Sequence, residues 1–151
     1  MSQDGIDLET SLGYLLKEAS SALRAAMEAV LRPLGMTVTH YSCLELLSQR
    51  PGLSNSELAR GAFVTRQSMN VLLQALERDG YVSRPAQARV GKVLPAQLTP
   101  RGRRSLEKAT AMVRSVEVRM LGGLTPEEQS DAHNILQSMI RSLRNDDERG
   151  T

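Results

Sequence analysis

The stretch LSNSELARGAFVTRQSMNVLLQALERDGYVSR, residues 53–84, decides the fold. It opens with Ser54 and Glu57 at the spacing of a capping box, in which the Ser hydroxyl and the Glu carboxylate each bind a free backbone N–H group at a helix start. The pattern predicts a short helix from Asn55 to about Ala62, followed after a tight turn by a second helix.

Thr65 can cap this second helix, and Asp79-Gly80 closes it. Apolar residues at the spacing i, i+3, i+4 and i+7 predict its buried face, which consists of Met69, Leu72, Leu73 and Leu76. The other face is polar and carries Arg66, Gln67, Asn70 and Gln74. Two helices joined by a tight turn, the second with a polar N-terminal end, are the ingredients of a helix-turn-helix.

A β-hairpin is predicted directly after this helix pair. Tyr81–Arg84 and Val93–Leu98 both have the composition of short strands, and a polar loop, Pro85–Lys92, joins them. Pro95 weakens the second strand because proline lacks the N–H group of a strand ladder. The hairpin makes the motif a winged helix-turn-helix lobe of about residues 37–98.

Two helices are predicted before the stretch 53–84. Apolar residues recur every three or four positions from Asp7 to Leu31, as on one face of a long helix that Pro33 and Gly35 end. Thr37 can cap the next helix, which runs to about Gln49.

Two further helices are predicted downstream. Thr99-Pro100 and Thr125-Pro126 each place a cap and an N1 proline at a helix start. Gly122-Gly123 ends the first of these helices, and the second is expected to fray from Asn145 onward.

The terminal segments, about residues 7–36 and 99–145, carry more apolar positions than a small winged-helix core needs. We expect them to be dimerisation helices that pair across a two-fold axis in a homodimer, since apolar surface left on a monomer is costly. The alternative is that they fold back on their own core. The predicted fold class is mainly α with a small β-hairpin wing, as one domain spanning residues 1–151.

The composition indicates a basic region and the cellular location of the protein. The net charge is only +2, but residues 84–108 hold seven basic residues and one acid, which suits a polyanionic partner. Cys43 is the only cysteine, and no signal peptide or long apolar run is present. We therefore expect a cytoplasmic protein without membrane contact.

The polar helix face has the chemistry that reading DNA requires. Gln and Asn can pair bidentately with adenine and Arg with guanine, while hydroxyl groups and the helix N-terminus favour phosphate oxygens. The alternative is an ordinary solvated face. The side chains predicted to contact double-stranded DNA are Ser54, Thr65, Arg66, Gln67, Ser68, Asn70, Gln74, Arg84, Arg89 and Lys92.

These residues resemble the MarR family of transcription regulators over about Leu8 to Leu143. The strongest likeness is the stretch 53–84, with its capped ELA helix and TRQ start, and the wing exit Leu98-Thr99-Pro100-Arg101-Gly102 also matches. The resemblance implies a homodimer that binds a palindromic operator, most often as a repressor, with one recognition helix per subunit in the major groove.

By the same resemblance, Arg89 falls on the wing-tip arginine that enters the minor groove. The commonest wing of the family has an acidic residue before that arginine, whereas Ala88 stands here. Lys92 or Arg84 could share the backbone contact, and a solvated loop is the alternative.

The resemblance also implies a small aromatic or anionic effector, with a pocket for which the candidates are Tyr14, His40, Tyr41 and Met112. Each of these side chains has a purely structural alternative. Cys43 is expected to be a buried structural thiol, with oxidant sensing as the alternative. Two separated histidines and one cysteine do not form a metal site, and no cofactor is predicted.

No enzymatic motif is present, so the sequence predicts no enzyme. The competing hypothesis is a winged-helix module that binds a protein partner without specific DNA binding.

Overall fold

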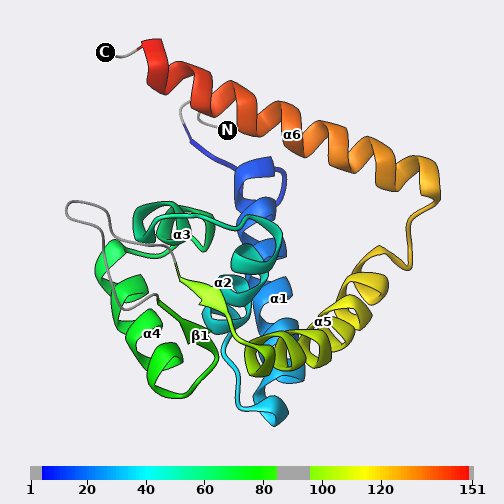
Figure 1. Ribbon diagram of the computed structural model, residues 1–151. Helices are drawn as coiled ribbons and strands as arrows, with labels where there is room; N and C mark the ends of the chain where they lie inside the picture. The colour runs from blue at the N-terminus through cyan, green and yellow to red at the C-terminus, as the bar shows by residue number, and fades with distance from the viewer. Residues whose placement is uncertain (1–4, 85–95, 150–151) are drawn as a thin grey trace. The chain divides into compact units, whose positions relative to one another are not determined.

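The computed structural model describes residues 5–84 and 96–149, with side chains up to residue 145. The elements in these ranges follow the predicted order (Figure 1). They are α1 (Leu12–Leu31), the 3-10 helix η1 (Arg32–Leu34), α2 (Val38–Gln49), α3 (Asn55–Gly61), α4 (Arg66–Arg78), β1 (Val82–Ser83), β2 (Gln97–Leu98), α5 (Pro100–Leu121) and α6 (Pro126–Arg149).

The predicted caps are present. Thr37, Ser54 and Thr65 each accept a hydrogen bond from the backbone N–H group three residues later, at 3.1, 3.2 and 3.0 Å. At the start of α6, Thr125 and Glu128 exchange reciprocal bonds of 3.1 and 3.0 Å. These helix starts follow from side chains within three residues of one another, and for that reason the sequence could predict them.

Two helix ends differ from the prediction. The first helix begins at Leu12 and not at Asp7, because Ser11 caps it through the N–H group of Tyr14 and the preceding residues form a turn closed on the Asp7 carbonyl. The expectation of fraying from Asn145 was wrong, since α6 continues to Arg149. No proline or glycine interrupts α6 after Pro126, so nothing in it breaks the helix.

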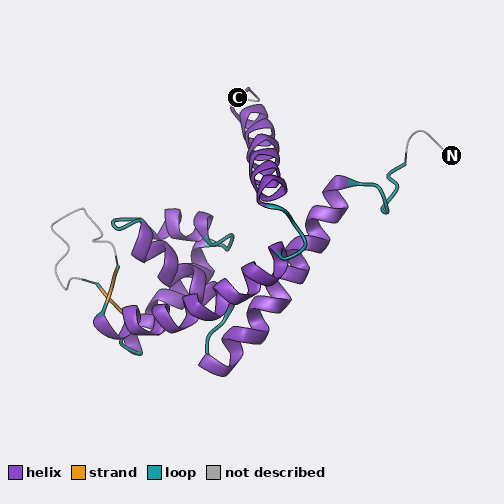
Figure 2. Ribbon diagram, turned by 90° about the vertical axis from the view of Figure 1, so that its right-hand side faces the viewer, coloured by secondary structure: helices purple, strands orange, loops and turns teal. Residues whose placement is uncertain are grey.

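The strands pair antiparallel, Val82 with Leu98 and Ser83 with Gln97 (Figure 2). Within the described residues, Tyr81, Arg84 and Ala96 lie outside the strands that were predicted to include them. Pro95 and most of the wing, residues 85–95, lie outside the described residues.

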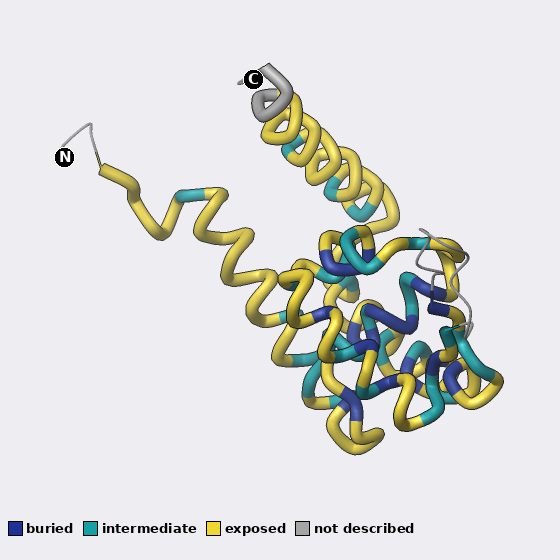
Figure 3. The backbone as a smooth tube through the Cα atoms, turned by 60° about the vertical axis from the view of Figure 1, so that its left-hand side comes forward, coloured by how far each residue is buried: buried dark blue, intermediate teal, exposed yellow. Residues whose placement is uncertain are grey.

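The chain divides into two compact units, residues 1–116 and 117–151. The first unit has one core, shown in dark blue in Figure 3, to which the C-terminal end of α1, α2, α3, α4, the wing and the first part of α5 contribute. Its most deeply buried large side chains are Leu31, Cys43, Leu44, Leu58, Met69 and Leu73. Three of the four residues of the predicted buried face of α4 are in this core, and Leu72 packs against it half-buried.

Candidate nucleic-acid interface

Helices α3 and α4 form the predicted helix-turn-helix. Leu58 of α3 and Met69 and Leu73 of α4 are each fully buried, so the two helices share one apolar contact. This contact leaves the opposite side of α4 free. Arg66, Gln67, Asn70 and Gln74 are all exposed there, and Arg66 forms no ion pair within the described residues.

The N-terminus of α4 is exposed and capped by Thr65. The Thr65 hydroxyl accepts the N–H group of Ser68 at 3.0 Å and donates its own proton to Ser68 Oγ at 2.9 Å. Thr65 therefore acts as the cap, while the Ser68 hydroxyl proton remains available to a ligand. The N–H groups of Arg66 and Gln67 in the first turn also lack helical acceptors, as at any helix start, and the helix dipole favours a phosphate there.

Asn70 is held by a residue that the sequence analysis missed. The side-chain amide of Asn55, the first residue of α3, donates a hydrogen bond of 2.6 Å to Asn70 Oδ1. The carbonyl oxygen of Asn70 thus already accepts a hydrogen bond within the protein. Because bidentate adenine pairing needs both groups, Gln67 and Gln74 suit that role better than Asn70 does.

Val71 is a second residue that the sequence analysis missed. Its side chain is 62% exposed and lies one helical turn from Gln67, on the polar side of α4. The signal was present in the spacing, since residues 67, 71 and 74 share one helix face. An apolar side chain among amides adds a surface that can contact a thymine methyl group.

Ser54 serves chiefly as the cap of α3. Its backbone N–H group donates to Glu57 at 3.1 Å, and this bond, followed by the one with the Ser54 side chain, lowers the pKa of the Glu57 carboxyl. The Ser54 hydroxyl is thus engaged with Glu57, and a phosphate contact stays a prediction for this residue.

The basic residues of the wing are only partly described. Arg84 Nε lies 3.5 Å from Glu77 Oε2 of α4, so this side chain connects the base of the wing to α4. Arg89 and Lys92 lie outside the described residues. DNA contacts of all three stay predictions.

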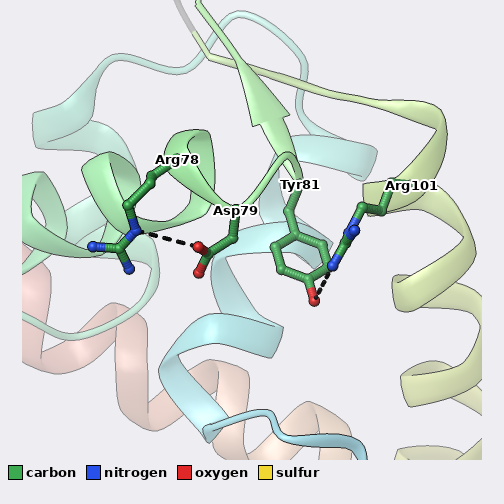
Figure 4. A network of polar contacts seen from close by, with 4 residues as sticks. All are labelled: Arg78, Asp79, Tyr81 and Arg101. Atoms are coloured by element: carbon green, nitrogen blue, oxygen red, sulfur yellow. Dashed lines mark hydrogen bonds and ion pairs between the residues drawn. The ribbon is translucent and has the colours of Figure 1, made fainter.

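A cavity of about 270 Å³ lies beside the start of α5. Its lining consists of Leu34, Tyr81, Arg101, Arg104, Ser105 and Lys108. The guanidinium carbon of Arg101 stands 4.8 Å from the centre of the Tyr81 ring, and Nη2 donates a long hydrogen bond of 3.4 Å to the Tyr81 hydroxyl (Figure 4). Among the described residues, none of the three cations forms an ion pair with a carboxylate.

The four predicted effector residues are not among those that line this cavity. His40 comes nearest, because its ring stands edge-on to Tyr81 with centroids 5.3 Å apart. Burial lowers the pKa of His40, and the charge of Asp79 partly opposes the shift. Tyr41 lies in the core, while Tyr14 and Met112 are exposed on α1 and α5. Their role in effector binding stays a prediction.

Cys43 is fully buried, and this burial raises the pKa of its thiol to about 12. Among the described residues, no three His, Cys, Asp or Glu side chains converge as metal ligands do. In the same part of the chain, no helix is long and apolar enough to cross a membrane.

This chain is similar in sequence to known proteins. The MarR family model matches residues 34–92. The HTH-type transcriptional repressor Rv2887 of Mycobacterium tuberculosis (strain H37Rv) is 44% identical over 135 residues, which cover 89% of this chain and 97% of the repressor.

Two solved structures of the same mycobacterial protein are similar over nearly their full length. The complex with DNA has a TM-score of 0.71 at 44% identity and covers 86% of this chain and 98% of that one. The complex with salicylic acid has a TM-score of 0.73 at 43% identity and covers 92% and 99%. The chain therefore belongs to the MarR family of winged helix-turn-helix transcription regulators, which is not a class of enzymes.

Proposed function

We propose that this protein is a transcriptional repressor that binds a palindromic operator as a homodimer and is released from it by a small aromatic anion. The observation that carries the proposal is the exposed polar face of α4, where Arg66, Gln67 and Gln74 are accessible on a helix-turn-helix held by buried leucines and methionine. The DNA complex of a 44% identical repressor supports the same role for this chain.

Exposed apolar side chains support dimerisation. On α1, Leu12 is 62% exposed and Leu15 43%, while on α6 the exposed residues include Ile140 and Leu143. A second copy would cover such surfaces. A two-fold dimer presents two recognition helices to half-sites one DNA turn apart, which is what a palindrome requires.

The cavity beside Tyr81 supports the effector. Its volume of about 270 Å³ is slightly below the roughly 300–1,000 Å³ usual for drug-sized ligands, which suits a small ligand. It combines an aromatic ring with the cations of Arg101, Arg104 and Lys108. An aromatic carboxylate matches both features. The complex of the mycobacterial relative with salicylic acid supports this ligand class.

Tyr81 offers a route from the cavity to the DNA-binding elements. Its N–H group donates to the Leu76 carbonyl of α4 at 2.9 Å, and its carbonyl accepts the N–H group of Thr99 at 3.1 Å. A ligand that displaces Arg101 from the Tyr81 ring would shift the residue that joins α4 to the wing. Such a shift would change the position of the recognition helix.

The test of operator binding is a fluorescence anisotropy titration against DNA from around the protein's own gene, with random DNA as competitor and with salt varied. We expect specific binding whose log affinity falls with log salt by about 0.9 per phosphate neutralised. Gln67→Ala should reduce discrimination between operator and random DNA, and Gln137→Ala, the same change on the exposed surface of α6, should not. Weak binding that is independent of sequence and salt would favour the protein-binding module instead.

The effector is tested by adding salicylate to the protein–operator complex. Release of DNA by the wild type, lost in Arg101→Gln, is the expected result. Arg103→Gln removes the same charge two residues along α5 but does not line the cavity, so this variant should respond as the wild type does. An equal response of both variants would place the effector elsewhere.

A further inference from the structure

Phe63, in the turn between α3 and α4, has two unusual properties at once. Its φ angle is +58°, and among the described residues no other non-glycine residue has a positive φ. Its side chain is also 88% exposed, which is the largest exposed fraction among the described large apolar residues.

The backbone at Phe63 follows a hydrogen-bonding pattern that normally selects glycine. The N–H group of Phe63 donates to the Arg60 carbonyl at 3.2 Å, and the N–H group of Val64 donates to the Ala59 carbonyl at 3.0 Å. These are the two bonds of a Schellman motif, with Phe63 at the left-handed position where glycine, or sometimes asparagine, ends a helix without strain. A phenyl side chain at this position strains the backbone.

Neither the turn nor the core accounts for the phenyl ring. The turn would form more easily with glycine, and the exposed ring adds nothing to the core. The apolar contact that closes the motif comes from Val64, which packs against the core. A strained, exposed aromatic residue is therefore retained where the fold alone disfavours it, a combination that points to a contact with a partner.

The position of Phe63 identifies the partner as DNA. The residue lies two positions before Thr65, the cap of α4, and four before Gln67. A turn that directly precedes the recognition helix reaches the groove edge together with the first turn of that helix. The apolar groups of DNA available there are deoxyribose carbons and thymine methyl groups.

We propose that Phe63 contacts operator DNA, with its ring against these apolar groups at the edge of the major groove. The inference rests on the proposed repressor function and adds to it an apolar contact from the turn. It predicts that removing the ring lowers the affinity for operator DNA without lowering the stability of the fold.

The test uses Phe63→Asn and Phe63→Gly, both compatible with a positive φ, and Phe63→Leu, which keeps an apolar side chain. We expect the Asn variant to melt at or above the wild-type temperature and to remain dimeric, while its operator affinity falls about tenfold. The Gly variant should lose similar affinity, and the Leu variant should retain part of it. Replacing single operator thymines by deoxyuridine distinguishes a methyl contact, which weakens wild-type binding at one position, from a contact with sugar alone.

Three results would overturn the proposal. Wild-type affinity in both turn-compatible variants would show that the ring does not touch DNA, even though the repressor function stands. A lower melting temperature or a monomeric Asn variant would place the ring in the fold or in the dimer. If the wild type binds no operator, the proposed function fails and this inference fails with it.

Discussion

At the scale of single residues, Val71 offers the most direct test of base reading. Its methyl groups project from the helix face that Gln67 and Gln74 share, where adenine recognition brings the methyl of the paired thymine close. We expect Val71→Ala to lower operator affinity about fivefold, the equivalent of about 1 kcal/mol. Replacing one critical thymine by deoxyuridine should weaken the wild type but not the variant. Val118→Ala, at a 67% exposed position on α5, is the matched control, and equal losses in both variants would contradict the contact.

Cys43 is the residue that decides whether the protein senses oxidants directly. Its sulfur is fully buried and its pKa is raised to about 12, so almost no thiolate exists near neutral pH. We expect the native protein to resist labelling by a thiol reagent at pH 8 and to react fully after unfolding in urea. Rapid labelling of the native protein would make a sensor role tenable.

His40 gives the folded state a dependence on pH. Burial lowers its pKa in the folded chain below the 6.5 of the unfolded chain, so the unfolded state binds the proton more readily. The contribution of His40 to stability is complete above pH 6.5 and is lost as the pH falls through the folded pKa. Between pH 7.5 and 5, the melting temperature of the wild type should therefore fall more than that of His40→Asn. If the melting temperatures of the wild type and His40→Asn fall equally, groups other than His40 cause the pH dependence.

At the scale of elements, the junction between the wing and α5 depends on Gly102. A Cβ atom at this position would lie 2.1 Å from the Tyr81 carbonyl oxygen, a backbone atom that cannot move aside. Thr99 holds the same junction, because its hydroxyl donates to the Gly80 carbonyl at 2.6 Å and accepts the N–H group of Gly102 at 3.0 Å.

The close contact at Gly102 yields a stability prediction. Gly102→Ala should lower the free energy of unfolding by about 3 kcal/mol, at the upper end of the usual cost of overpacking. The measurement is urea unfolding followed by circular dichroism. Gly123→Ala is the matched control, since its Cβ would meet no atom within 4 Å. If both variants unfold at the same urea concentration, α5 does not approach Tyr81 as closely as described.

At the scale of the whole molecule, operator affinity should depend on dimerisation through the terminal helices. Ile140 and Leu143 are 47% and 73% exposed on α6. We expect the double change to Asp to give a monomer in sedimentation and to reduce operator affinity at least a hundredfold, since each monomer then binds one half-site alone. Ser138→Asp adds a charge at an exposed position on the opposite face of the same helix and should leave the dimer intact. A dimeric double variant with full affinity would show that α6 is not in the interface.

Much of the fold followed from local signals in the sequence. Ser54 with Glu57, Thr65, and Thr125 with Glu128 cap helices through bonds that span three residues, and such bonds form with little help from distant parts of the chain. The apolar spacing of α4 likewise placed Met69, Leu73 and Leu76 in the core. The helix limits at Asp7 and Asn145 were predicted wrongly, because apolar periodicity does not show where a competing cap or a continuing polar helix sets the end.

The sequence by itself therefore determined the order of the elements, the polar face of α4 and membership in the MarR family. Only the tertiary structure decided that Asn55 occupies the oxygen of Asn70, that Gly102 must lack a side chain, and that Tyr81 joins a cationic cavity to the recognition helix. The physical reason is distance along the chain. Caps and periodicity act within one or two helical turns. The contacts of Asn55 with Asn70, of Tyr81 with Arg101 and of Tyr81 with Gly102 join residues 15, 20 and 21 positions apart, and how the helices pack decides whether such residues meet.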